Sequence, residues 1–221
     1  MKTNVILAGD SAEILKGFEP DCIDLSVQSP PYDSLRAYKG FKFDFPSIAS
    51  QLFRVTKEGG ILVWIVDDET KEGARSCTSY RQLLHFVDLG FQLYEDMVYK
   101  KNTSGYPPSK HYENVSEKMF VLSKGLPKTV NLLKDKKNKW AGTSNFGIRT
   151  NRQQDGTLKE RGKSIVAPYG IRQNIWEYPT GKGYSASDDY AYEHPAIFPE
   201  ALARDHILSW SNEGDIVLDC F

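Results

Sequence analysis

The chain has 221 residues, enough for one sizeable hydrophobic core or for one core with a small appended unit. Its hydrophobic content of 40% and charged content of 26% exclude a disordered or fibrous chain and are typical of a globular protein. No apolar run approaches the ~18 residues of a membrane span, and the N-terminal residues lack the apolar stretch of a signal peptide.

The three cysteines, Cys22, Cys77 and Cys220, lie far apart and show no metal-binding spacing. We therefore expect a cytoplasmic protein in a reducing environment, with neither a disulfide framework nor a metal site. Cys22 opens an apolar strand-like run, where a structural role is the expected one.

The net charge of −1 hides an uneven distribution. Residues 124–163 contain eleven Lys and Arg against three acidic residues, so the remaining chain is acidic. One strongly basic segment in a nearly neutral protein indicates a polyanion that only part of the chain contacts.

The first residues, Asn4–Ala8, have the apolar composition of a β-strand, and a helix is predicted to begin near Ser11. Either Asp10 or Ser11 is expected to cap that helix. At a strand end, Asp10 either accepts hydrogen bonds from a ligand or simply serves as the cap.

An apolar strand then breaks abruptly at Ser29-Pro30-Pro31-Tyr32. Neither proline can donate a backbone N–H, and Pro31 holds Pro30 in an extended conformation, so the carbonyls there face whatever lies beyond the strand. The Ser29 hydroxyl and the Tyr32 ring add an acceptor and a stacking face, a combination suited to an amino group on a planar ring. The alternative is a buried strand that ends in a proline turn.

Further apolar patterns predict alternating helices and strands. The predicted helices are Phe45–Val55, Ser79–Leu89 and Glu200–Ser209, and the predicted strands are Ile61–Val66, Phe91–Tyr99, Ser116–Leu122 and Ile216–Phe221. This alternation favours an α/β fold with a mostly parallel sheet, which binds ligands beyond the carboxyl ends of its strands. Asp10, Ser29 and Asp67 all follow predicted strands.

The basic segment is rich in Gly, Asn and Gln and poor in large apolar residues. It is interpreted as a DNA-facing insertion, with a solvated surface loop as the alternative. Trp140 within it is either a wedge or part of a small local core. The candidate DNA-binding residues are Lys134, Lys136, Lys137, Lys139, Arg149 and Arg152.

Together these segments resemble the DNA amino-methyltransferases that modify N4 of cytosine or N6 of adenine, in the permuted motif order called the β class. Ser29-Pro30-Pro31-Tyr32 matches the catalytic motif, and Gly9-Asp10 matches the segment before it. Val55–Val66 is similar to the family's helix–strand unit. Glu193–Pro199 is similar to the HPA-x-FP segment, and Ile216–Phe221 to the start of the cofactor strand.

The resemblance implies a Rossmann-like methyltransferase sheet with helices on both faces and an inserted basic target-recognition region. Residues 1–123 would form the catalytic half, residues 124–170 the target-recognition insertion and residues 171–221 the start of the half that binds S-adenosylmethionine. The catalytic residues implied are Ser29, Pro30, Pro31 and Tyr32. The cofactor-binding residues implied are Asp10, His194, Pro195, Ala196, Phe198, Asp219 and Phe221.

Two departures from the family pattern occur at the last strand. Cys220 replaces a proline, and the sequence ends before the expected Gly-rich cofactor loop. We therefore expect either a second chain or a missing C-terminal segment to complete the cofactor site. The alternative is a catalytically inactive DNA-binding remnant.

The implied reaction is direct methyl transfer to the amino group of a base flipped out of duplex DNA. Acceptors at Ser29 and Pro30 would bind the two N–H groups, and Tyr32 would stack on the base. Serine at the first motif position favours N4 of cytosine over N6 of adenine, while Gln28 in place of a threonine weakens that preference. An RNA or protein amino-methyltransferase is a further alternative, although the basic insertion makes a protein substrate less suitable.

Overall fold

The computed structural model describes residues 3–31, 43–102, 110–144, 149–161, 164–194 and 197–221. Its contacts divide the chain into two compact units, one formed by Met1–Asn131 with Asn174–Phe221 and the other by Leu132–Gln173. The second unit overlaps the insertion predicted at 124–170, although residues 124–131 belong to the first unit.

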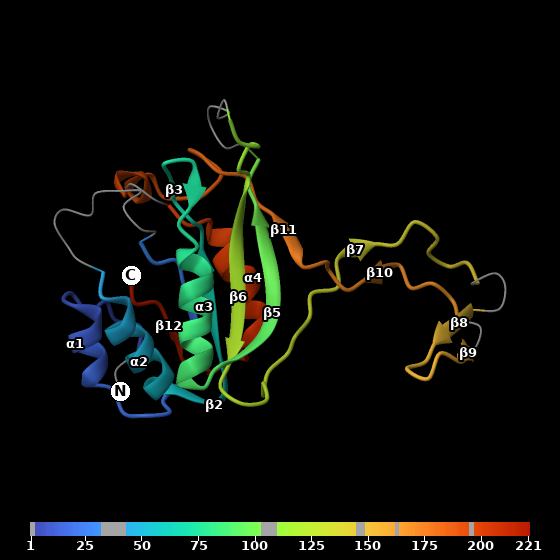
Figure 1. Ribbon diagram of the computed structural model, residues 1–221, viewed down its shortest axis with the longest axis horizontal. Helices are drawn as coiled ribbons and strands as arrows, with labels where there is room; N and C mark the ends of the chain where they lie inside the picture. The colour runs from blue at the N-terminus through green and yellow to red at the C-terminus, as the bar shows by residue number, and fades with distance from the viewer. Residues whose placement is uncertain (1–2, 32–42, 103–109, 145–148, 162–163, 195–196) are drawn as a thin grey trace. The chain divides into compact units, whose positions relative to one another are not determined.

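A six-stranded sheet forms the first unit, in the order β11-β5-β6-β2-β1-β12 (Figure 1). Its strands are β1 (Ile23–Gln28), β2 (Thr56–Val66), β5 (Gln92–Lys100), β6 (Ser116–Ser123), β11 (Ile175–Glu177) and β12 (Val217–Leu218). β12, β1 and β2 pair in parallel, as do β11 and β5, whereas β6 is antiparallel to both of its neighbours. The sheet is therefore mixed, and every strand except β6 ends at the same edge.

Helices cover both faces of this sheet, as Figure 1 shows with α3 in front of it and α4 behind. The helices are α1 (Ser11–Lys16), α2 (Phe45–Val55), α3 (Thr78–Leu89) and α4 (Glu200–Trp210), with a 3₁₀-helix at Asp189–Glu193. Two short strands, β3 (Thr70–Lys71) and β4 (Ala74–Arg75), form a small hairpin before α3. The helices predicted from the sequence are confirmed, and Gly90 ends α3 with the positive φ of 115° expected of a C-terminal glycine.

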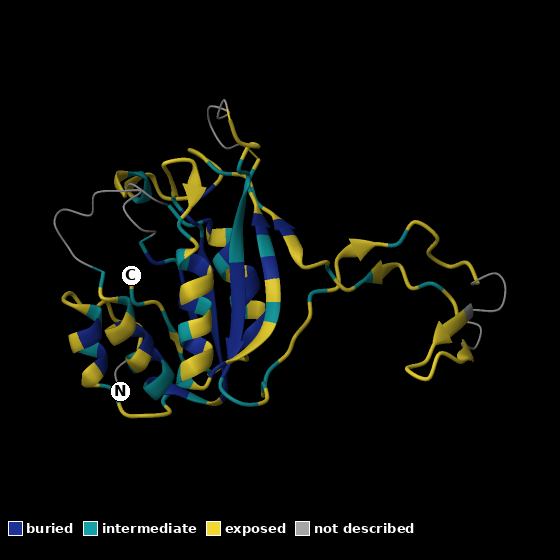
Figure 2. Cartoon of the chain, in the orientation of Figure 1, coloured by how far each residue is buried: buried dark blue, intermediate teal, exposed yellow. Residues whose placement is uncertain are grey.

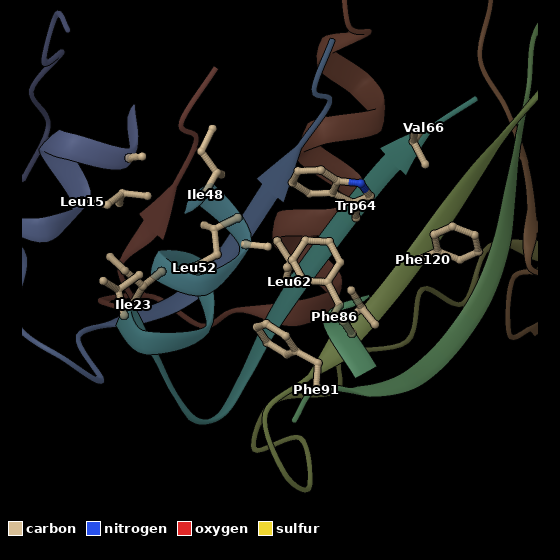
Figure 3. Packing of buried hydrophobic residues seen from close by; sticks show 14 residues of the cluster. Leu15, Ile23, Ile48, Leu52, Leu62, Trp64, Val66, Phe86, Phe91 and Phe120 are labelled. Atoms are coloured by element: carbon tan, nitrogen blue, oxygen red, sulfur yellow. The ribbon is translucent and has the colours of Figure 1, made fainter. Parts of the chain in front are cut away.

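The core lies between α1–α3 and one face of the sheet. Trp64 and Phe86 are fully buried there and meet edge to face, with ring centroids 5.0 Å apart (Figure 3). Ile65 is also fully buried although it faces the other side, so β2 is covered on both faces, as its unbroken apolar run predicts. On the α4 face, His206 is buried against Trp176, with ring centroids 4.6 Å apart.

Asp68 fixes the start of α3. The N-cap residue Cys77 makes no side-chain cap, and the Asp68 carboxylate instead accepts the Ser79 N–H at 2.8 Å and the Ser79 hydroxyl at 2.9 Å. Lys118 Nζ lies 3.0 Å from the same carboxylate. Burial alone would raise the pKa of Asp68, but these hydrogen bonds and the ammonium together lower it.

The predicted strand at Asn4–Ala8 is wrong. Residues 3–10 form no strand, and Ile6 is 99% exposed. A strand needs a neighbour, but β12 pairs only with β1, and Asn4 has a positive φ of 57° that interrupts an extended chain. The C-terminal strand is shorter than predicted, since only Val217 and Leu218 pair.

The second unit is built from backbone hydrogen bonds rather than from a core. β7 (Lys136–Lys137) pairs with β10 (Tyr169–Gly170), and β8 (Arg149–Arg152) pairs with β9 (Leu158–Arg161), both antiparallel. None of its described residues is buried (Figure 2).

Two absences concern only the described part of the chain. No helix in it is long and apolar enough to cross a membrane. No group of three His, Cys, Asp or Glu side chains in it is arranged as a metal site.

Candidate active site

A large open cleft of about 3070 Å³ extends from residues 3–19 along β1 and β12 to the sheet edge where the parallel strands end. Typical small-ligand sites measure ~300–1,000 Å³, so this cleft can hold more than one small molecule. Residues from β1, β2, β5 and β12, or directly after them, line it together with the chain that leads into α4.

The motif predicted to be catalytic lies in the wall of this cleft. Ser29, Pro30 and Pro31 follow β1 directly and all three line the cleft. Pro30 is buried, while Ser29 and Pro31 are half-buried. Tyr32 lies outside the described residues. The motif's acceptors therefore occur where the sequence predicted them, at the carboxyl end of a buried strand.

Asp219 and Phe221 follow β12 and also line the cleft. β12 is the parallel neighbour of β1, so this segment lies beside the catalytic motif. Although Asp219 is accessible to solvent, the surrounding cleft wall desolvates its carboxylate and raises its pKa, opposed by the amides of Phe221 and Cys220. The Phe221 ring meets Trp64 edge to face, with ring centroids 5.9 Å apart.

Gln28 joins these two segments. Its side chain is fully buried, and its amide Nε2 donates to the Leu218 carbonyl at 3.2 Å. Its Oε1 accepts the Cys220 N–H at 3.0 Å and the Cys220 thiol at 3.3 Å. Regular pairing between β1 and β12 ends at Leu218. The Gln28 side-chain amide therefore extends the hydrogen bonding between the two segments as far as Cys220.

Asp10 precedes α1 and lines the cleft. Its carboxylate accepts the Glu13 N–H at 3.0 Å, so the capping role predicted for it is present. The next residue, Ser11, donates its hydroxyl to the Cys220 carbonyl and places the start of α1 against the end of β12.

The segment before α4 contributes His194 and Phe198 to the cleft wall. His194 is exposed and Phe198 is half-buried. Pro195 and Ala196 lie outside the described residues. All the candidate cofactor-binding residues that the structure describes therefore line one cleft, although they come from three distant parts of the chain.

Sequence reasoning missed several polar residues of the same wall. Tyr99 and Lys101 lie at the end of β5, and Glu117 lies opposite Tyr99 in the register of β6. Lys101 Nζ lies 2.9 Å from Glu117 Oε1. Their positions at the ends of predicted strands could have identified them. The same criterion identified Asp67, which also lines the cleft.

The described candidate DNA-binding side chains are all exposed. Lys134, Lys136, Lys137, Lys139 and Arg152 lie on the second unit and face solvent. The backbone of Arg149 starts β8, but its side chain is not among those that the structure describes.

Exposed apolar side chains accompany this positive charge. Trp140 is 65% exposed, with Lys139 Nζ 5.3 Å from its ring centroid, so it is not part of a local core. The second unit thus combines cations and an exposed aromatic ring on a small antiparallel scaffold.

Comparison with known proteins relates this arrangement to a family. The family model described as DNA methylase, for N6 and N4 methyltransferases, matches residues 23–221. The orphan methyltransferase M.BamHII of Bacillus amyloliquefaciens is 49% identical over 203 residues, which cover 91% of this chain and 77% of that protein. The DNA adenine methyltransferase YhdJ of Escherichia coli (strain K12) is 25% identical over 234 residues, covering 100% of this chain and 71% of that protein.

Solved structures share the fold. The PvuII DNA methyltransferase, described as cytosine-N4-specific, superposes with a TM-score of 0.64 at 19% identity, covering 96% of this chain and 71% of that one. A putative DNA modification methylase of Thermus thermophilus, solved in complex with S-adenosyl-L-methionine, gives a TM-score of 0.57 at 21% identity, covering 96% of this chain and 78% of that one.

Proposed function

This chain belongs to the DNA methylase family of N6 and N4 methyltransferases, and we propose that it transfers a methyl group to the exocyclic amino group of a base extruded from duplex DNA. The observation that carries this proposal is the adjacency of two segments in one cleft. Ser29 and Pro30 end one strand, Asp219 follows its parallel neighbour, and the buried Gln28 amide joins the two strand ends.

The chain's own contribution to the chemistry is the set of acceptors after β1. An exocyclic amine is a weak nucleophile because its lone pair is delocalised into the ring. The Ser29 hydroxyl and the Pro30 carbonyl, as fixed acceptors, would bind its two N–H groups and favour the geometry in which the lone pair is free.

The cofactor of this family is S-adenosylmethionine, whose sulfonium supplies the methyl group. The described residues fit it, because two acidic side chains, Asp10 and Asp219, and two aromatic side chains, Phe198 and Phe221, line the same cleft. Asp219 and Asp10 would hold its polar groups, while Phe198 and Phe221 would pack on its apolar parts. His194 would line the pocket beside Phe198.

A second chain, or a further segment, that completes the cofactor site would be able to pair with the outer edge of β12. This outer edge of β12 meets no strand among the described residues. Sedimentation at increasing protein concentration tests the second-chain form of this proposal, since a monomer at every concentration contradicts it.

We favour N4 of cytosine as the target over N6 of adenine, because serine at the first motif position is associated with cytosine in this family. Digestion of methylated DNA to nucleosides, followed by mass spectrometry, tests this directly. N6-methyladenine as the product would overturn the preference and leave the reaction type intact.

The second unit is proposed to read the DNA. A two-stranded β-ribbon fits the major groove, and the β7–β10 and β8–β9 pairs are ribbons of this kind. Lys134, Lys136 and Lys137 would contact phosphates, since isolated lysines position a protein on DNA without reading its sequence. Because the unit has no buried residue of its own among those described, contact with DNA is expected to stabilise it.

The central experiment compares Ser29→Ala with Ser26→Ala. Ser26 lies on the same strand, is fully buried and does not line the cleft. We expect Ser29→Ala to lower methyl incorporation into DNA by ~10²–10³-fold, as removal of one stabilising donor or acceptor does, while DNA affinity stays near that of the wild type.

Ser26→Ala should methylate DNA at nearly the wild-type rate. A fully active Ser29→Ala variant would remove this hydroxyl from the mechanism. A wild-type chain that binds DNA but transfers no methyl group would favour the DNA-binding remnant instead.

A further inference from the structure

Two neighbouring tyrosines on the α4 side of the sheet differ in how their hydroxyls are satisfied. The rings of Tyr99 and Tyr178 lie 6.2 Å apart between centroids. The Tyr178 hydroxyl donates to Asp205 Oδ2 at 2.6 Å. The Tyr99 hydroxyl is also buried, yet it has no hydrogen-bond partner among the residues that the structure describes. A buried donor without an acceptor is costly, so an acceptor from outside these residues is expected.

The surroundings of Tyr99 point to a ligand. Tyr99 lies in the wall of the cleft together with Lys101, Glu117 and Asp67. Glu117 is the nearest carboxylate in the sheet register, but its Oε1 is 2.9 Å from Lys101 Nζ and it makes no hydrogen bond to the Tyr99 hydroxyl. No described side chain supplies this acceptor, and Tyr99 borders the cleft, so a molecule bound there is the candidate acceptor.

The strand order places this group on the substrate side of the catalytic motif. β1 lies between β12, which carries Asp219, and the strands β2, β6 and β5. With a methyl donor held beside Asp219, the side of Ser29 that faces β2, β6 and β5 would remain for the acceptor. Side-chain alternation and the strand registers place Ser29, Asp67, Glu117 and Tyr99 on the same face of the sheet.

On the basis of the proposed function, we propose that the Tyr99 hydroxyl determines specificity. It would donate a hydrogen bond to the ring edge of the extruded base whose amino group lies at Ser29. Three strand spacings of ~4.8 Å separate β1 from β5, about 14 Å along the edge. A tyrosine side chain tilted toward β1, one heterocyclic ring and two hydrogen bonds of about 2.9 Å would together span such a distance.

The chemistry of the two partners is complementary. Burial, with a smaller contribution from the Glu117 carboxylate, raises the pKa of Tyr99, so the phenol remains a protonated donor at neutral pH. Cytosine presents ring N3 and O2 as acceptors on the edge beside its amino group, and adenine presents N1.

The test uses the full chain with [¹³Cζ]tyrosine, and 2′-deoxycytidine 5′-monophosphate as the probe. The Tyr99 resonance is assigned by its absence from Tyr99→Phe. We expect it to move on addition of the nucleotide but not of deoxyribose 5-phosphate, which lacks the base. The affinity for the nucleotide should fall about 2- to 10-fold in Tyr99→Phe, the effect of one hydrogen bond.

Tyr178→Phe is the matched control, since it removes a hydroxyl from the adjacent ring that is already bonded to Asp205. It should lower the melting temperature without changing nucleotide affinity, whereas Tyr99→Phe should leave the melting temperature unchanged. A fall in melting temperature for Tyr99→Phe as large as that for Tyr178→Phe would reveal an acceptor within the chain and overturn the proposal.

Failure of this inference is distinguishable from failure of the proposed function. A Tyr99 resonance that ignores the nucleotide, or responds equally to deoxyribose 5-phosphate, overturns the Tyr99 assignment even if the chain methylates DNA. A chain that shows the expected shift but never transfers a methyl group supports the base subsite and contradicts the reaction.

Discussion

Replacing Gln28 with leucine should loosen residues 217–221, which we propose bind the cofactor, without disturbing the rest of the sheet. Leucine is similar in size and keeps the buried volume, but it removes the amide that bonds the Leu218 carbonyl and the Cys220 N–H. The change therefore isolates the hydrogen bonds from the packing of a residue that has no exposed surface.

The expected magnitude follows from the two backbone groups left behind. An unsatisfied buried donor or acceptor costs ~1–3 kcal/mol. Both Leu218 and Cys220 are only half-buried, so water can partly replace the amide and the lower end applies to each. We expect a loss of about 2 kcal/mol, which for a chain of this size corresponds to a fall of roughly 4–8 °C in Tm.

Thermal unfolding and hydrogen exchange at residues 217–221 measure this effect, and Ser26→Ala is the control. The Ser26 hydroxyl is buried on the same strand and has no hydrogen-bond partner in the described part of the chain, so its removal should change Tm little. The reasoning would be refuted by a Gln28→Leu variant whose Tm and whose Cys220 amide exchange both match those of Ser26→Ala.

Two further changes test the α3 cap and the second unit. Asp68→Asn should cost on the order of 1–3 kcal/mol at pH 7, because it weakens the cap and the pairing with the ammonium. Since the folded pKa of Asp68 is lowered, this difference is fully present above the unfolded value of about 4 and should shrink in urea titrations as the pH falls through the folded pKa. A difference that persists at low pH would contradict the role of the charge. Lys136→Ala with Lys137→Ala should weaken binding to all DNA sequences alike and reduce the salt slope by ~1 for each phosphate that is no longer bound, measured by fluorescence anisotropy. The control is Lys128→Ala, which lies in the first unit beside Gly59 and should leave the salt slope unchanged. A change in salt slope as large as that of the Lys136 and Lys137 variant would contradict the assignment of DNA binding to the second unit.

The sequence was most informative where local pattern and burial agree. The run Ile61–Val66 is apolar at every position and is buried on both faces, and Phe45–Val55 has a single apolar stripe and forms α2 at those bounds. The position of Ser29 was equally predictable, because two prolines follow it and end a buried strand at the cleft wall.

Pairing could not be predicted in the same way, because it depends on distant partners. Asn4–Ala8 has the composition of a strand but finds no neighbour, and β6 turns out to be antiparallel within an otherwise parallel set. The bond between Gln28 and Cys220 joins residues 192 positions apart, so no local pattern indicates it. Tyr99 was hidden for a related reason, since only the strand order brings the end of β5 into the wall that contains Ser29.

The strand order also explains how the permuted order of motifs still brings the predicted site residues together. A parallel sheet gathers the carboxyl ends of its strands at one edge whatever their order in the chain. β1 precedes β12 by nearly the whole sequence, yet the two are neighbours, so Ser29 and Asp219 reach the same cleft. Chemistry at this edge therefore depends on which strands are adjacent and on how firmly their ends are held together. The Gln28 amide is a side-chain contact between the ends of β1 and β12. Its removal keeps the two strands adjacent but loosens their ends, so it should show how much methyl transfer depends on the rigidity of the strand ends.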